Sequence, residues 1–305
     1  MPLPQRSEGQ VLGSKLLAKV GSSLLLEAGD AVRLVELQGD ALEVRCELEH
    51  EWGDRFALAQ DGRIARSGER IELLSPDAEA VTLPELPGLD PAELAFLGRD
   101  LVVFPSLRSE LEPILPWRWD GREWTPLDRL APGEGWVDER EIWHLDGHCV
   151  HDRGTDLLLW DGRVLQTAGS HGFDELAGPG LRFGNAFGVA RLGAERLVLS
   201  LEHELWSVLG RARKRLLPGI TGVLGVHGGP DGSVVAPLGR NEAGLAAVVL
   251  WPSGSHTELA HAQLGTDTEV GAMIVPLGEW LLVARGYDGI ARRVAWAEVA
   301  ALPRI

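Results

Sequence analysis

Cysteine is scarce in this 305-residue chain, which contains only Cys46 and Cys149. Two cysteines cannot build a disulfide framework, and a chain of this length buries a sizeable core without cross-links. No run approaches about 18 apolar residues, so the sequence predicts no membrane-spanning helix, and the N-terminal residues do not resemble a secretion signal. These absences favour a protein of the reducing cytoplasm.

Positive charge is also scarce, since 29 Lys and Arg stand against 45 Asp and Glu, giving a net charge of −16. Such a field repels nucleic-acid phosphates and anionic membrane surfaces, so neither is an expected partner. The one basic run, residues 211–215 (RARKR), is expected to be a solvated turn, with docking to an acidic protein as the alternative. Lysine is rare beside arginine, alanine and glycine, which suggests a bacterial source.

What the chain does contain is a long repeat. Short apolar runs end at a tryptophan followed by a turn, at Trp119, Trp160, Trp206, Trp251 and Trp296. The spacings are 41, 46, 45 and 45 residues, and the register extends back to Leu74 and Leu37. Seven copies of one structural unit are therefore predicted.

Each copy has the pattern of a small antiparallel sheet. Segments of about 5–8 residues alternate with Gly, Pro or Asp-Gly turns, most clearly in residues 221–261. Six Asp-Gly pairs favour the primed turns that join hairpin strands. They begin at Asp61, Asp120, Asp146, Asp161, Asp231 and Asp288. Four antiparallel strands in about 40 residues make one propeller blade.

The predicted fold is therefore all-β, a seven-bladed β-propeller of four-stranded antiparallel blades, forming a single domain over residues 1–305. The approximate blades are 15–51, 52–85, 92–130, 133–170, 180–220, 221–264 and 266–305. An N-terminal strand is expected to close the ring by pairing with the last blade, and the repeated tryptophans to wedge between neighbouring blades. Residues 89–97 (LDPAELAFL) are the main candidate for a helical turn.

Two segments carry a family resemblance. Residues 154–164 (GTDLLLWDGRV) and 116–124 (PWRWDGREW) resemble WD-repeat strands, in which Trp-Asp closes the third strand of a blade. Trp119 and Trp160 carry the full Trp-Asp pair, and Asp156 stands where the family has a turn-supporting aspartate. The resemblance implies a divergent WD-repeat-like propeller that serves as a rigid platform for other proteins rather than as an enzyme.

Clusters of chemically active residue types are present but do not converge in the expected fold. Zinc-ligand types lie within eight residues at His144, His148, Cys149 and His151, yet strand alternation and the Asp146 turn would separate them. The types of a hydrolytic triad occur at Ser170, His171 and Asp174, without a Gly-x-Ser-x-Gly elbow. We therefore expect no catalytic residues, no metal and no cofactor.

The candidate binding face is the longest connection outside the strand pattern, residues 169–186. Phe173 and Phe183 in this connection, with Trp136 in the preceding blade-to-blade connection, are the predicted partner-binding residues, because exposed aromatics bury large areas against a partner. The alternative is that both phenylalanines fold back over a blade edge.

These observations predict a non-catalytic protein–protein interaction scaffold, or a regulatory subunit of a bacterial multi-protein system in signalling or defence. Two alternatives stay open. One is a propeller enzyme of the lactonase or hydrolase type, with acidic or histidine side chains meeting in the central channel. The other is a glycan-binding lectin, suggested by 11 Trp beside one Tyr, although packing explains the five repeated tryptophans. A small-molecule or glycan ligand thus remains open beside a protein partner.

Overall fold

The computed structural model describes most of the chain. The described residues are 6–11, 13, 15–51, 54–75, 80–86, 91–97, 99–105, 117–126, 149–150, 157–160, 165–169, 172–175, 186–194, 196–201, 203–209, 212–266, 272–285 and 290–305. Their strands form seven four-stranded antiparallel sheets, which we number as blades 1 to 7.

The first three blades follow one another along the chain. Blade 1 comprises β2 (Lys15–Val20), β3 (Ser23–Ala28), β4 (Ala31–Gln38) and β5 (Ala41–Glu49). Blade 2 comprises β6 (Arg55–Leu58), β7 (Ile64–Ser67), β8 (Ile71–Leu74) and β9 (Ala80–Thr82). Blade 3 comprises β10 (Pro91–Leu97), β11 (Asp100–Pro105), β12 (Trp117–Trp119) and β13 (Trp124–Pro126).

The next three blades repeat this order. Blade 4 comprises β14 (Cys149–Val150), β15 (Leu157–Trp160), β16 (Leu165–Gly169) and β17 (Gly172–Glu175). Blade 5 comprises β18 (Ala186–Leu192), β19 (Arg196–Leu201), β20 (Glu204–Leu209) and β21 (Ala212–Leu216). Blade 6 comprises β22 (His227–Gly228), β23 (Val234–Pro237), β24 (Leu245–Leu250) and β25 (His256–Ala260), with the short η1 (Pro230–Gly232) between β22 and β23.

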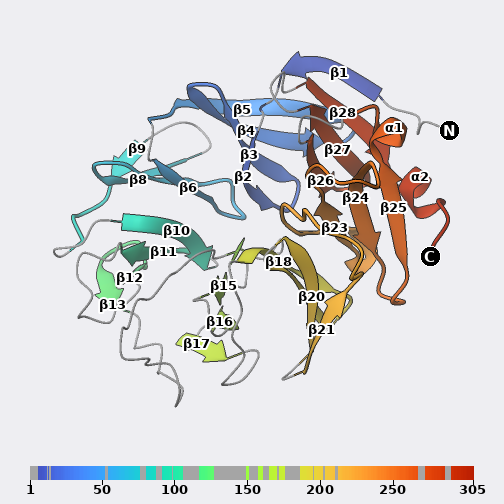
Figure 1. The fold of residues 1–305 in the computed structure, drawn as a ribbon. Coiled ribbons are helices and arrows are strands. Elements are labelled where there is room, and N and C mark those ends of the chain that lie inside the picture. The colour runs from blue at the N-terminus through green and yellow to red at the C-terminus, as the bar shows by residue number, and fades with distance from the viewer. Residues whose placement is uncertain are drawn as a thin grey trace.

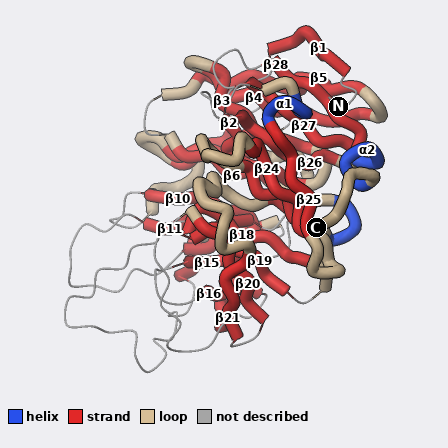
Figure 2. Tube along the Cα trace, turned by 45° about the vertical axis from the view of Figure 1, so that its right-hand side comes forward, coloured by secondary structure: helices blue, strands red, loops and turns tan. Residues whose placement is uncertain are grey.

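Blade 7 joins the two ends of the chain. Its strands β26 (Ala272–Leu277), β27 (Trp280–Arg285) and β28 (Ile290–Ala295) are completed by β1 (Arg6–Val11), which pairs antiparallel with β28 in the register Arg6↔Arg293. Both views show β1 lying along β28 (Figures 1 and 2). The expected closure of the ring by an N-terminal strand is therefore confirmed.

The blades are arranged around a common centre in chain order (Figure 1). The first strands of neighbouring blades contact one another, β2 with β6, β6 with β10, β18 with β22 and β22 with β26, so these strands lie innermost. The fourth strand of each blade is then the outer edge. The all-β propeller of four-stranded antiparallel blades predicted from the sequence is confirmed.

The hydrophobic core is divided among the interfaces between adjacent blades. In blades 1, 2, 3, 5, 6 and 7, each sheet presents apolar side chains to its neighbour, because a sheet cannot bury either face alone. Trp251 and Trp296 lie together in the core between blades 6 and 7, and Trp119 lies in the core between blades 2 and 3. These three tryptophans are wedges between blades, as the repeat predicted.

The Trp-Asp positions fit the resemblance only in part. Trp119 ends β12, the third strand of blade 3, as in WD repeats. Trp160 ends β15, which is the second strand of blade 4, and its side chain lies outside the described set.

The Asp-Gly pairs that the structure describes do connect strands. Asp61 lies between β6 and β7, Asp120 between β12 and β13, and Asp231 in η1 between β22 and β23. The following glycines have φ of 85°, 98° and 69°, a region that glycine enters without a steric penalty. The pairs at Asp146, Asp161 and Asp288 lie outside the described residues.

Residues 89–97 are the main candidate for a helical turn in the sequence, and this expectation is wrong for the described residues 91–97, because they form strand β10. Leu94 and Phe96, two positions apart, are 2% and 1% exposed, so the segment buries one face at the period of a strand. Pairing with β11 decides the conformation of this ambiguous apolar run. The described α-helices are the short α1 (His261–Leu264) and α2 (Trp296–Ala300), and no helix among the described residues is long and apolar enough to span a membrane.

Candidate functional site

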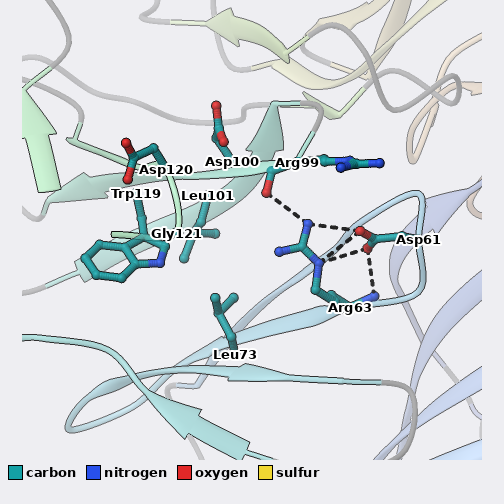
Figure 3. A pocket seen from close by; sticks show the side chains of 9 residues that line it. All are labelled: Asp61, Arg63, Leu73, Arg99, Asp100, Leu101, Trp119, Asp120 and Gly121. Carbon is teal, nitrogen blue, oxygen red and sulfur yellow. Dashed lines mark hydrogen bonds and ion pairs between the residues drawn. The ribbon is translucent and has the colours of Figure 1, made fainter. Parts of the chain in front are cut away.

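A pocket of about 330 Å³ lies where blades 2 and 3 meet (Figure 3). Its walls come from the β6–β7 turn, the β10–β11 turn and the β12–β13 turn. In an antiparallel sheet, the turns after the first and third strands lie at the same end, so this geometry follows from the up-and-down order of the strands.

Arg63 forms one wall of the pocket. Its Nε donates to both carboxylate oxygens of Asp61, at 3.1 and 3.0 Å, and its Nη2 donates to the main-chain oxygen of Arg99 at 2.9 Å. The guanidinium also lies 5.5 Å from the ring centre of Phe96, within the range of a cation–π contact. Arg63 therefore ties the turn of blade 2 to the first turn of blade 3.

The opposite wall carries two further aspartates. Asp100 accepts hydrogen bonds from the Nε and Nη2 of Arg118, the first at 2.7 Å. Asp120 is exposed, and its Oδ1 accepts the backbone N–H of Arg122 at 2.8 Å and of Glu123 at 3.1 Å. The three pocket aspartates thus have three different sets of partners.

The protonation of two of these carboxylates follows from their contacts. Backbone N–H groups of Glu123 and Arg122 hold the pKa of Asp120 below its ordinary value. Burial alone would raise the pKa of Asp61, but hydrogen bonds and charge from Arg63 outweigh it and lower that pKa. Both groups are therefore ionised at neutral pH, and neither is poised to exchange a proton there.

The floor of the pocket is apolar. Leu101 and Trp119 belong to the core between blades 2 and 3, and Leu73 packs against that core. Figure 3 shows Leu73 and Leu101 pointing toward each other from neighbouring blades, with Trp119 beside them, Asp100 and Asp120 above and Asp61 to the right. A ligand here would meet a hydrophobic base and a charged rim.

The sequence-predicted binding residues are not brought together by the described structure. Phe173 lies on β17, where it pairs with Ala168, and its side chain lies outside the described set. The expectation that residues 169–186 form one continuous connection is thus wrong, because residues 172–175 complete blade 4 as its fourth strand. Phe183 and Trp136 lie outside the described residues.

The described part of the basic run, residues 212–215, is not a turn. Residues 212–216 form β21, the outer strand of blade 5, where Arg215 forms an ion pair with Glu204 at 2.5 Å and Lys214 is exposed. Charges on an outer strand discourage edge-to-edge association, which accounts for their place in the fold.

The inner strands bring one further titratable pair together. Lys19 on β2 donates its ammonium to the main-chain oxygen of Gly228 on β22 at 2.8 Å, a contact between blades 1 and 6. Burial, with a smaller contribution from the Lys19 charge, lowers the pKa of the neighbouring His227 to about 4. His227 is therefore neutral at physiological pH.

The other chemically suggestive residues form no cluster in the described part of the chain. No group of three or more His, Cys, Asp or Glu able to hold a metal ion occurs among the described residues. Cys149 opens β14, while His144, His148 and His151 lie outside the described set. Asp174 lies on β17, but Ser170 and His171 are likewise outside it. Burial raises the pKa of the Cys46 thiol, which disfavours a reactive thiolate.

Sequence reasoning missed the pocket between blades 2 and 3. Asp61 and Asp120 were identified only as turn residues, and the sequence separation between them hides their proximity. Their proximity could have been inferred from the predicted fold, because the turns after the first and third strands of neighbouring blades lie at the same end of a propeller.

Comparison with known structures supports the fold. Virginiamycin B lyase from Staphylococcus aureus matches with a TM-score of 0.61 at 10% identity, covering 96% of this chain and 98% of the lyase chain. The Cps50 (Swd1) β-propeller domain of Myceliophthora thermophila matches with a TM-score of 0.62 at 12% identity, covering 96% and 99%. The YCF48 structure with bound D1 peptide matches with a TM-score of 0.62 at 13% identity, covering 97% of each chain.

No protein-family model matches the sequence, and no curated protein matches it in sequence. At 10–13% identity the structural matches define the fold alone. The protein has the fold of a β-propeller.

Proposed function

We propose that this protein is a non-catalytic interaction platform, a cytoplasmic scaffold or regulatory subunit of a bacterial multi-protein system in signalling or defence. The proposal rests on the aspartates of the pocket between blades 2 and 3, which already have hydrogen-bonding partners within the protein. Asp61 and Asp100 are each engaged by an arginine, and Asp120 is engaged by its own turn. A catalytic acid or base works best with a pKa near the operating pH, whereas Asp61 and Asp120 are held ionised.

Similar folds are found with protein and peptide partners. The YCF48 structure carries a bound D1 peptide, which supports a protein or peptide partner for a chain of the same fold. The streptogramin-type lyases share the fold too, but at 10% identity this likeness does not transfer their activity. A closed ring of packed blades offers a stable surface on which turns and connections can meet a partner.

The partner-binding residues that we propose are Phe173, Phe183 and Trp136. A large aromatic side chain outside the core buries substantial area on association, and such residues often dominate the energy of binding. Their assignment rests on the sequence.

The test is purification of the tagged protein from the organism that carries its gene, followed by titration of the recovered partner with purified variants. A Phe173→Ala, Phe183→Ala double variant should weaken binding at least about tenfold, the effect of losing about 1.4 kcal/mol, with an unchanged melting temperature. The matched control is Val81→Ala, which removes an apolar side chain that is 59% exposed on the outer strand of blade 2.

Three outcomes contradict parts of this proposal. Unchanged affinity of the double variant removes the two phenylalanines from the partner site. Lost stability without lost affinity assigns them to the core. Recovery of the protein without any stoichiometric partner contradicts the platform itself.

A further inference from the structure

Residues 301–305 (ALPRI), which we call the strap, run from the end of α2 onto the outer edge of blade 6. The main chain of Ile305 pairs with that of His256 on β25, and the N···O distances in the two directions are 2.8 and 3.1 Å. A reciprocal pair of this kind is the unit of an antiparallel ladder. Both views show the C-terminal end of the chain beside β25 (Figures 1 and 2). The strap therefore extends the sheet of blade 6 beyond its outer strand.

The side chains of this region also fix the strap in place. The Arg304 guanidinium lies 4.3 Å from the ring centre of Trp251, within the range of a cation–π contact. Thr257 Oγ1 donates to the main-chain oxygen of Pro303 at 3.3 Å, and Leu302 packs against the core between blades 6 and 7. Main-chain pairing at a sheet edge, combined with particular side-chain contacts, is one way in which extended peptides are recognised.

The strap can be opened without disturbing the blade beneath it. Pro303, Arg304 and Ile305 are exposed, the last of them at 68%, so little of their surface is buried against blade 6. Segments that bury little apolar surface open at a lower free energy than core strands do. Opening would uncover the edge of β25 and the face of Trp251, which is only 4% exposed with Arg304 lying against it.

We propose that the strap is an autoinhibitory segment, and that the edge of β25 with Trp251 receives an extended segment of the partner protein when the strap detaches. The strap itself shows which chemistry fits this site, namely main chain that pairs with β25 and an arginine between apolar residues. Arginine suits the site because its planar guanidinium stacks on aromatic faces, whereas an ammonium is a compact point charge. This inference rests on the proposed function and adds a regulated contact to it.

Tethering makes the strap an effective competitor. A tethered segment has a high effective concentration at its site, so a free peptide of the same sequence binds weakly. A partner that is already held elsewhere on the propeller gains the same advantage and can displace the strap. Protection of the edge alone does not require such a strap, since β21 is protected by its own charges.

Hydrogen exchange on the full chain measures the opening of the strap. The His256 amide donates to Ile305, whereas Thr257 lies opposite Val249 and bonds inward to β24, because neighbouring residues of a strand bond to opposite sides. The His256 amide should exchange at least about tenfold faster than the Thr257 amide. Arg304→Ala should speed exchange at His256 by a further factor of about three to ten, because the cation–π contact is lost.

Peptide binding tests the site beneath the strap. The probes are acetyl-Ala-Leu-Pro-Arg-Ile-amide and the same peptide with citrulline, which is an uncharged analogue of arginine. The ¹⁵N-labelled indole signal of Trp251, identified by its loss in Trp251→Phe, reports occupancy. The arginine peptide should shift this signal saturably and bind Arg304→Ala about threefold to tenfold more tightly than the parent, because a weaker strap leaves the site open for more of the time. The citrulline peptide should bind about threefold to tenfold more weakly than the arginine peptide.

Arg122→Ala is the matched control. It removes an exposed arginine from a turn of blade 3 and should change neither exchange at His256 nor binding of the peptide. Equal effects of Arg122→Ala and Arg304→Ala would overturn the inference, because the response would then reflect the net charge of the protein.

Several other results would also overturn it. They are exchange at His256 as slow as at Thr257, no saturable shift with the arginine peptide in Arg304→Ala, and equal binding of the arginine and citrulline peptides. Self-association of Arg304→Ala without peptide binding would show that the strap only protects an edge. None of these results would affect recovery of a stoichiometric partner through Phe173 and Phe183, so failure of this contact is distinguishable from failure of the platform.

Discussion

Replacing Trp251 by alanine tests whether the repeated tryptophans hold neighbouring blades together. The side chain is 4% exposed and lies in the core that joins blades 6 and 7. Its ring centre is 5.7 Å from that of Trp296, its Nε1 donates to Thr257 Oγ1 at 2.9 Å, and the Arg304 guanidinium lies 4.3 Å from its ring centre. One substitution therefore removes a large buried volume, a hydrogen bond and a cation–π contact.

The expected loss is about 3–5 kcal/mol, the range for truncating a buried aromatic side chain to alanine. Loss of the hydrogen bond from Trp251 adds little to this cost, because the Thr257 hydroxyl also donates to the main-chain oxygen of Pro303 at 3.3 Å and so keeps a partner. At about 2 °C for each kcal/mol in a chain of this size, the melting temperature should fall by about 6–10 °C. Trp251→Phe, which keeps an aromatic ring, should cost about half as much or less.

Thermal and denaturant unfolding followed by far-ultraviolet circular dichroism measures these changes. Lys214→Ala, an exposed substitution on β21, is the control and should leave the melting temperature nearly unchanged. A fall of less than about 2 °C for Trp251→Ala would refute the wedge argument. The same change at Trp160, whose side chain lies outside the described set, is predicted to be equally costly if that residue is a wedge as well.

Three further predictions concern the closure of the ring by β1, the protonation of His227 and the backbone conformation of Gly121. Deleting residues 1–11 removes β1 and leaves β28 as an open edge; the truncated chain should unfold at a lower temperature and self-associate, as light scattering can detect. For His227, the unfolded chain takes up a proton near pH 6.5 and the folded one only near pH 4. Stability should therefore fall by about 1–3 kcal/mol as the pH drops through this window. His227→Gln should have a flatter dependence there, and parallel curves would contradict the assignment. Gly121→Ala should cost about 1–2 kcal/mol because φ is 98°, whereas Gly219→Ala, with open space and no left-handed φ, should be neutral.

Most of the architecture could be predicted from sequence because its signals repeat. The tryptophans and the Asp-Gly pairs can both be recognised from the local sequence. Their recurrence at a nearly constant spacing along the whole chain is typical of a propeller and is not expected for other β folds. The errors arose where the pattern was ambiguous. Residues 91–97 contain a short apolar run that fits a helix or a strand, and pairing with β11 selects the strand. Residues 172–175 lack an obvious strand composition, yet they pair with β16 as the last strand of blade 4.

The pocket could not be predicted, because its chemistry is assembled from distant turns. Asp61 and Asp120 each look like ordinary turn residues, and Arg63 like an ordinary surface arginine. Their roles follow only when blades 2 and 3 pack and Arg63 reaches the main-chain oxygen of Arg99. Position in the propeller, rather than local composition, determines which of many polar turn residues share a site.

If this propeller acts by holding another protein, native mass spectrometry combined with cross-linking should detect that protein bound to it. The protein should be tagged at its own gene, purified at physiological salt from cells at normal expression and cross-linked before digestion. We expect an assembly heavier than the tagged chain, whose own sequence contributes 33.0 kDa, with a second protein in fixed stoichiometry cross-linked to turns or connections at an end of the propeller. Recovery of the tagged chain alone, at its own mass and without cross-links to another protein, would contradict this function.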